Sequence, residues 1–161
     1  MKKWLILLPV LLMLCACGRQ PTVIAGDAQE TEVAYADLVH PIEAQTTLDD
    51  EEIACEPLQK DGGVYGFEMR FRRTDAVDAL LRDPENVYFG VLQTGKNKTA
   101  VPMEDIRILP DVSTDTLVLT LLLPQGSRLN TKNCTVSFYV SARAGEMDKA
   151  LFCAKKTGDL S

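Results

Sequence analysis

The most regular pattern in the chain is an alternation of apolar and polar residues, which is the period expected of half-buried β-strands. It is clearest at residues 64–73, where Phe67, Met69 and Phe71 alternate with polar or charged neighbours, and at residues 116–123, where leucine recurs at every second position. Shorter stretches of the same kind lie at 52–56, 87–93, 98–101, 106–108, 134–141 and 150–156. The pattern predicts a series of short strands separated by turns roughly every 8–12 residues.

One segment departs from this alternation and predicts a short helix between two strands. Thr74 suits the N-cap position, and Val77, Leu80 and Leu81 form a small apolar stripe on one face. Pro84 ends the helix, because the residue before a proline avoids the helical conformation. The whole pattern predicts a mainly β fold, an antiparallel β-sandwich that is immunoglobulin-like or related and carries one short helix.

The N-terminal residues predict export and a lipid anchor. Lys2 and Lys3 precede an apolar run over residues 4–14, which is shorter than the roughly 20 residues that a membrane-spanning helix needs. The run ends in the sequence Leu-Cys-Ala-Cys at 14–17, which resembles the lipobox of bacterial lipoproteins. The resemblance implies a signal peptide over 1–16 and lipidation of Cys17, since a small residue precedes that cysteine. An ordinary secretory signal that happens to contain cysteines is the alternative.

The acidity of the protein is concentrated in the next segment. The chain has 161 residues and a formal net charge of −6, and residues 18–52 carry nine acidic side chains against the single basic Arg19. Such a stretch predicts an acidic flexible tether over 17–50 and a folded domain over 51–161. Within the tether, Val33–Val39 is apolar enough to be a docking segment that pairs as a strand or short helix. The acidic balance argues against nucleic acid as a partner.

Three cysteines remain once the signal peptide and the lipidated residue are set aside, and export permits disulfides. If the last two strands form a hairpin that turns at 143–144, Cys134 lies opposite Cys153, and the two form a candidate disulfide with Cys55 as a free thiol. A bridge from Cys55 to either of the others would instead join two sheets. All three are expected on the apolar faces of their strands.

A set of basic residues forms a candidate patch for an anionic partner. Some lie on the outward face of the strand at 64–73 or just after it, and the others lie in a predicted hairpin tip. A charged face that contacts only solvent is the alternative. The patch residues are Arg70, Arg72, Arg73, Lys96 and Lys98.

Candidate chemistry is sparse. The single histidine, His40, lies in the predicted tether, so no preorganised Ser–His or Cys–His pair is expected, and the spacing of zinc ligands is absent. We therefore expect no catalytic residue, no metal and no cofactor. A carboxylate hydrolase is the enzymatic alternative, and it requires two acids that converge in a cleft. The candidate acids are Glu68, Glu104, Asp111 and Asp115.

These features predict a non-enzymatic protein of the cell envelope, anchored by lipid to the outer side of the cytoplasmic membrane or to the outer membrane. Its expected partners are the membrane, through the lipid, and another envelope protein of which it would be an accessory subunit. A surface-exposed glycan- or peptide-binding module is the other non-enzymatic alternative.

Overall fold

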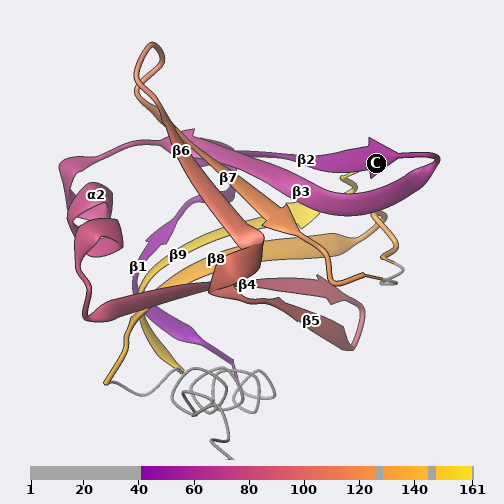
Figure 1. Ribbon diagram of the computed structural model, residues 1–161. Coiled ribbons are helices and arrows are strands. Elements are labelled where there is room, and N and C mark those ends of the chain that lie inside the picture. The colour runs from indigo at the N-terminus through magenta and orange to yellow at the C-terminus, as the bar shows by residue number, and fades with distance from the viewer. Residues whose placement is uncertain (1–40, 126–128, 145–147, 161) are drawn as a thin grey trace, which may run out of the picture.

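Two β-sheets packed face to face form the body of the protein in the computed structural model, which describes residues 41–125, 129–144 and 148–160 (Figure 1). One sheet has five strands in the order β1-β9-β8-β4-β5, and the other has four in the order β2-β3-β7-β6. The prediction of a mainly β sandwich with a short helix is confirmed. All paired strands are antiparallel except β1 and β9, which are parallel.

The chain crosses between the sheets several times. The five-stranded sheet consists of β1 (Glu43–Leu48), β4 (Asn86–Thr94), β5 (Asn97–Val101), β8 (Cys134–Ala142) and β9 (Lys149–Gly158). The four-stranded sheet consists of β2 (Ile53–Lys60), β3 (Gly63–Arg72), β6 (Ile106–Asp111) and β7 (Thr116–Leu122). Among the described residues, the helical elements are the α-helix α2 (Asp75–Arg82) and two short 3₁₀ turns, η2 (Asp50–Glu52) and η3 (Met103–Asp105).

Strand β1 falls inside the stretch that we predicted to be tether, so the prediction was wrong for these residues. Glu43 pairs with Lys149 and Leu48 pairs with Ala154, which makes β1 an edge strand of the five-stranded sheet. Its sequence, EAQTTL, lacks apolar alternation. The strand is held by backbone hydrogen bonds to β9 and by the packing of Leu48 against the core. Neither contact requires alternating apolar residues, so nothing in the sequence indicated this strand.

The core lies between the sheets, and the alternation predicted it correctly on β3 and β7. Phe67, Met69 and Phe71 are at most 2% exposed. Each lies opposite a buried leucine of β7, and Met69, for example, pairs with Leu119. Close packing of this kind leaves little room for added atoms.

Helix α2 carries the chain from β3 in one sheet to β4 in the other and covers one end of the sandwich (Figure 1). As predicted, the Thr74 hydroxyl caps the helix by accepting a hydrogen bond from the Val77 amide at 3.3 Å. Val77 is buried, and Leu80 and Leu81 pack against the same core. The apolar stripe therefore closes the core at this end.

Candidate functional site

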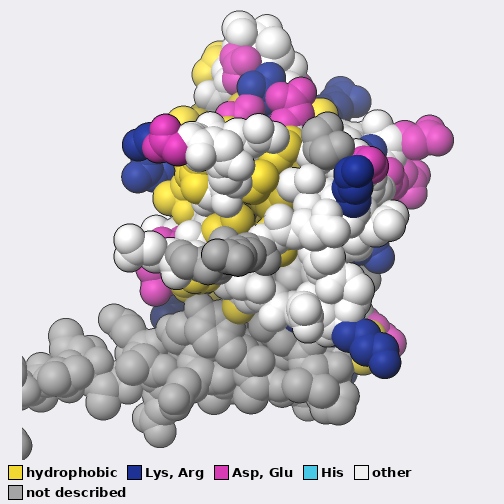
Figure 2. Space-filling model, turned by 90° about the vertical axis from the view of Figure 1, so that its right-hand side faces the viewer, with side chains coloured by type: hydrophobic (Ala, Val, Ile, Leu, Met, Phe, Trp, Pro, Cys, Tyr) yellow, Lys and Arg dark blue, Asp and Glu magenta, His cyan; other side chains and the backbone are white. Residues whose placement is uncertain are grey.

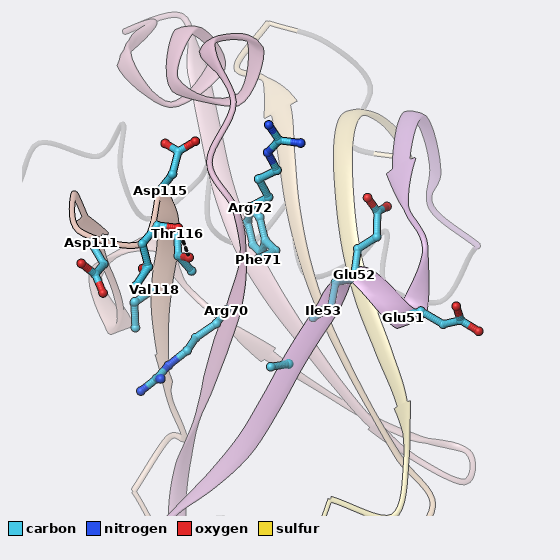
Figure 3. A pocket seen from close by; sticks show the side chains of 12 residues that line it. Glu51, Glu52, Ile53, Arg70, Phe71, Arg72, Asp111, Asp115, Thr116 and Val118 are labelled. Atoms are coloured by element: carbon cyan, nitrogen blue, oxygen red, sulfur yellow. Dashed lines mark hydrogen bonds between the residues drawn. The ribbon is translucent and has the colours of Figure 1, made fainter.

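The outer face of the four-stranded sheet carries an open groove of about 640 Å³ (Figure 3). Its floor is formed by residues of β2, β3 and β7, one wall by the η2 turn, and the other wall by the hairpin that joins β6 to β7. The groove is thus assembled from three separate stretches of the chain, 51–54, 70–72 and 111–118. Its lining residues are Glu51, Glu52, Ile53, Ala54, Arg70, Phe71, Arg72, Asp111, Thr114, Asp115, Thr116 and Val118.

Strand register sets the order of side chains across the floor. Arg70 lies opposite Ala54 on one side and Val118 on the other. One step along the same face, Arg72 lies opposite Thr116. Because side chains alternate between the two faces of a strand, these residues point away from the buried Phe71. The floor therefore combines two guanidinium groups with small apolar and hydroxyl side chains.

The η2 wall is held by contacts to the other sheet. The Asp50 carboxylate accepts a hydrogen bond from the Thr157 amide at 2.9 Å and lies 3.0 Å from the Lys156 ammonium. These contacts hold the pKa of Asp50 below its usual value, with the Thr157 hydrogen bond as the largest cause. The adjacent Glu51 and Glu52 line the groove from this anchored turn.

The β6–β7 hairpin projects from the body and forms the opposite wall (Figure 1). The Asp111 carboxylate accepts hydrogen bonds from the Ser113 hydroxyl at 2.6 Å and the Ser113 amide at 3.0 Å, and these bonds lower the pKa of Asp111. The Asp115 carbonyl accepts a hydrogen bond from the Arg73 amide at 2.9 Å, which ties the hairpin to the end of β3. Charged side chains of both signs gather where the hairpin leaves the body (Figure 2).

Two apolar side chains extend this site beyond the groove itself. Leu109 lies opposite Val118 in the sheet register and is 63% exposed. Val112, in the tip of the hairpin, is 81% exposed. The alternation of residues 106–108 gave no sign of either, since Leu109 lies in β6 beyond that stretch and Val112 follows the end of the strand.

The basic residues predicted as one patch do not form one. Arg70 pairs with Glu68, and Arg73 pairs with Asp78, whose hydrogen bond raises the pKa of Arg73. Lys96 and Lys98 belong to the β4–β5 hairpin of the other sheet, which lies at the far end of the body from α2 (Figure 1). Only Arg70 and Arg72 share the groove.

Arg72 differs from Arg70 and Arg73 in that its side chain has no charged partner among the residues that the structure describes. Within the described ranges, no hydrogen-bond or ion-pair partner contacts its guanidinium. Its side chain lies between Asp115 on one wall and Glu52 on the other (Figure 3). The groove thus holds an unpaired cation between two acidic walls.

The four acids considered for a hydrolase are only partly brought together. Asp111 and Asp115 line the groove, whereas Glu68 is bound to Arg70 and Glu104 lies in η3. The lowered pKa of Asp111 is the opposite of what a general acid needs. In the part of the chain that the structure describes, no group of three or more His, Cys, Asp or Glu residues could hold a metal ion.

The predicted pairing of Cys134 with Cys153 is wrong in register. Cys134 lies opposite Gly158, and Cys153 lies opposite Tyr139, because the β8–β9 hairpin turns further along the chain than 143–144. The two side chains also lie in different clusters: Cys134 belongs to the core between the sheets, and Cys153 belongs to a second cluster that contains Tyr139.

The thiols of Cys55, Cys134 and Cys153 are all free in the structure. Partial burial raises the pKa of the half-buried Cys55 to about 12, which suits a small apolar side chain rather than a reactive thiol. Cys17, His40 and the segment Val33–Val39 lie outside the described residues.

No protein-family profile matches the chain, and no curated protein is significantly similar to it. Among the described residues, no helix is both long and apolar enough to cross a membrane.

Proposed function

We propose that this protein is a lipid-anchored component of the cell envelope that binds a segment of another envelope protein in the groove of its four-stranded sheet. In this proposal it acts as an accessory subunit and not as an enzyme. The lipobox-like sequence at 14–17 supplies the anchor at Cys17. The acidic segment that follows separates the anchor from the sandwich.

The unpaired guanidinium of Arg72 is the observation that carries the proposal. A guanidinium presents several N–H donors in a planar fork that matches a carboxylate, so an unpaired one in a groove favours an anionic ligand group. The acidic walls at Glu52 and Asp115 would reject a ligand that is anionic throughout and favour one that also carries basic groups. A polypeptide segment with charges of both signs meets both conditions.

The exposed apolar residues beside the groove support a protein ligand further. Leu109 and Val112 offer apolar surface next to the charged floor and walls. Protein interfaces commonly combine apolar contacts with a surrounding polar rim. A glycan ligand would be favoured by aromatic side chains in the groove, and the residues that line the groove include no tyrosine or tryptophan.

Site-specific photo-crosslinking in intact cells tests the proposal. A photo-reactive amino acid at Val118, on the groove floor, should yield one dominant protein adduct in the full-length, membrane-bound chain. The same substitution at Lys96, in the β4–β5 hairpin, serves as the matched control and should not yield that adduct. If Val118 gives no protein adduct, or the same adducts as Lys96, the groove is not the binding site and the proposal fails.

A further inference from the structure

The outer face of the five-stranded sheet carries a second apolar cluster, which no described element covers. Phe89, Val91, Tyr139, Ala150 and Cys153 belong to it and are at most 9% exposed. The four-stranded sheet and α2 both pack on the other cluster, in the space between the sheets. A two-layer body leaves the outer face of each sheet to solvent, so side chains buried there require a covering segment.

Register shows that the cluster forms one continuous surface across neighbouring strands. Phe89 of β4 lies opposite Tyr139 of β8, and Tyr139 lies opposite Cys153 of β9. The rings of Phe89 and Tyr139 stack with centroids 5.4 Å apart. Phe138, next to Tyr139 in the chain, belongs to the core between the sheets, so strand alternation directs Tyr139 to the outer side.

A buried polar group on the same face points to a ligand. Ser141 is two residues beyond Tyr139, which puts its side chain on the outer side, and the residue is fully buried. Within the described ranges, its hydroxyl oxygen has no hydrogen-bond partner. Since buried hydroxyl groups are normally paired, the covering segment is expected to supply a polar atom at this place.

We propose that the segment Val33–Val39 of the same molecule covers this face. The undescribed N-terminal part ends at residue 40, and the first residues after it already pack against the cluster: Ile42 and Ala44 lie at its margin. The segment, VAYADLV, contains one charged residue within an otherwise acidic stretch. It is therefore both the nearest candidate in the chain and the most apolar part of the tether.

The reach and the local concentration of the segment agree with this assignment. Seven extended residues span about 23 Å, and a five-stranded sheet is about 19 Å across from first to last strand. A segment joined to the sheet by a few residues has an effective concentration in the millimolar range, which favours it over a second copy of the chain. Docking would leave only residues 18–32 as a free tether, with a root-mean-square reach of roughly 20 Å.

Cys153 provides a direct reporter, because its thiol lies under the proposed segment while Cys134 lies in the separate core. The full-length protein, purified from membranes, is treated with N-ethylmaleimide, and alkylation of each cysteine is followed by mass spectrometry. The double substitution Val33→Asp with Leu38→Asp should accelerate alkylation of Cys153 at least tenfold and leave Cys134 protected. The matched control, Thr22→Asp with Gln29→Asp, adds the same charge elsewhere in the tether and should change neither rate.

A second measurement covers the case in which the double variant fails to fold. A photo-reactive amino acid at Leu38 of the otherwise unaltered chain should give an intramolecular crosslink to the peptides that contain Phe89 or Tyr139. Equal alkylation of Cys153 in the variant and the control, with Cys134 protected in both, would overturn the inference. So would crosslinks from Leu38 that join two copies of the chain, or protection of Cys153 that disappears on dilution.

Discussion

The Asp50 carboxylate and the Lys156 ammonium lie 3.0 Å apart, although 106 residues separate them in the chain. The same ammonium donates a second hydrogen bond to the Asp50 carbonyl at 2.8 Å. Asp50 begins the turn that forms one wall of the groove, and Lys156 belongs to β9 of the opposite sheet. The five-stranded sheet does not line the groove, but through this contact it holds one of the groove's walls in place.

Loss of this contact should cost a modest amount of stability in a pH-dependent way. The folded-state pKa of Asp50 is lowered from 3.8, so its contribution is present above the unfolded pKa and is lost as pH falls through the folded pKa. Because Asp50 is largely exposed, we expect Asp50→Asn to cost at most about 1 kcal/mol at neutral pH. Urea unfolding at pH 7 and well below pH 3.8 measures both the cost and its disappearance.

Asp61→Asn is the control for that experiment, since Asp61 lies in an exposed turn and its left-handed backbone conformation also suits asparagine. It should leave stability unchanged at either pH. An Asp50→Asn variant as stable as the control at pH 7 would show that the contact contributes nothing.

The close approach of the two sheets at Gly90 should make this position intolerant of a side chain. A Cβ atom there would lie 2.6 Å from Cδ2 of Leu121 and 3.1 Å from Cβ of Val101. Gly90→Ala should therefore destabilise the protein by about 1–3 kcal/mol through overpacking. Gly63→Ala is the control, because its Cβ would meet nothing nearer than 3.7 Å. Equal unfolding midpoints of the two variants in urea would contradict the packing argument.

The proposed lipid anchor can be tested by substituting Cys17 and Cys15 separately, since only Cys17 is expected to carry the lipid. Cys17→Ser should abolish incorporation of labelled palmitate and release the protein from membranes, because in our proposal two or more acyl chains on Cys17 form the anchor. Cys15→Ser, two residues earlier, should keep both the label and the membrane association. If Cys17→Ser keeps the palmitate label and Cys15→Ser loses it, the lipidated residue is Cys15 and not Cys17. If the unaltered protein takes up no palmitate, the proposal of a lipid anchor is wrong.

The cysteines of the sandwich should carry no disulfide. Cys55, Cys134 and Cys153 are free, and the register separates Cys134 from Cys153. Denaturation without reductant, followed by alkylation, should therefore modify all three, as measured by peptide mass spectrometry. A linked peptide that joins Cys134 to Cys153 would contradict the strand register of β8 and β9.

Local patterns in the sequence predicted the core and the helix. The core strands show alternating apolar residues, and the helix begins after a residue type that is typical of an N-cap. Phe67, Met69 and Phe71 follow the period of a strand, and Thr74 caps α2 as its side chain suggests. Strand β1 left no such signal, because its partner β9 lies more than 100 residues away and its own sequence is mainly polar. The cysteine register depended on where a hairpin turns, which alternation alone does not determine.

The groove could not be predicted from the sequence, because it exists only where distant segments meet. Arg72 and Arg73 are neighbours of the same type, and only the folded chain shows that Asp78 pairs with Arg73 and leaves Arg72 unpaired. The acidic walls come from η2 and the β6–β7 hairpin, which about 60 residues of chain separate. Charge type was visible in the sequence, but the charge pairing that defines the site was not.

The most direct test of the account is the yield of the Val118 photo-crosslinked adduct when the groove cation is reversed. In intact cells that carry the full-length chain, Arg72→Glu should reduce the adduct at least tenfold, because it replaces the unpaired cation with a third acidic group. Lys96→Glu, a charge reversal of the same size outside the groove, should leave the yield unchanged. An undiminished adduct with Arg72→Glu would contradict the claim that this groove binds the partner.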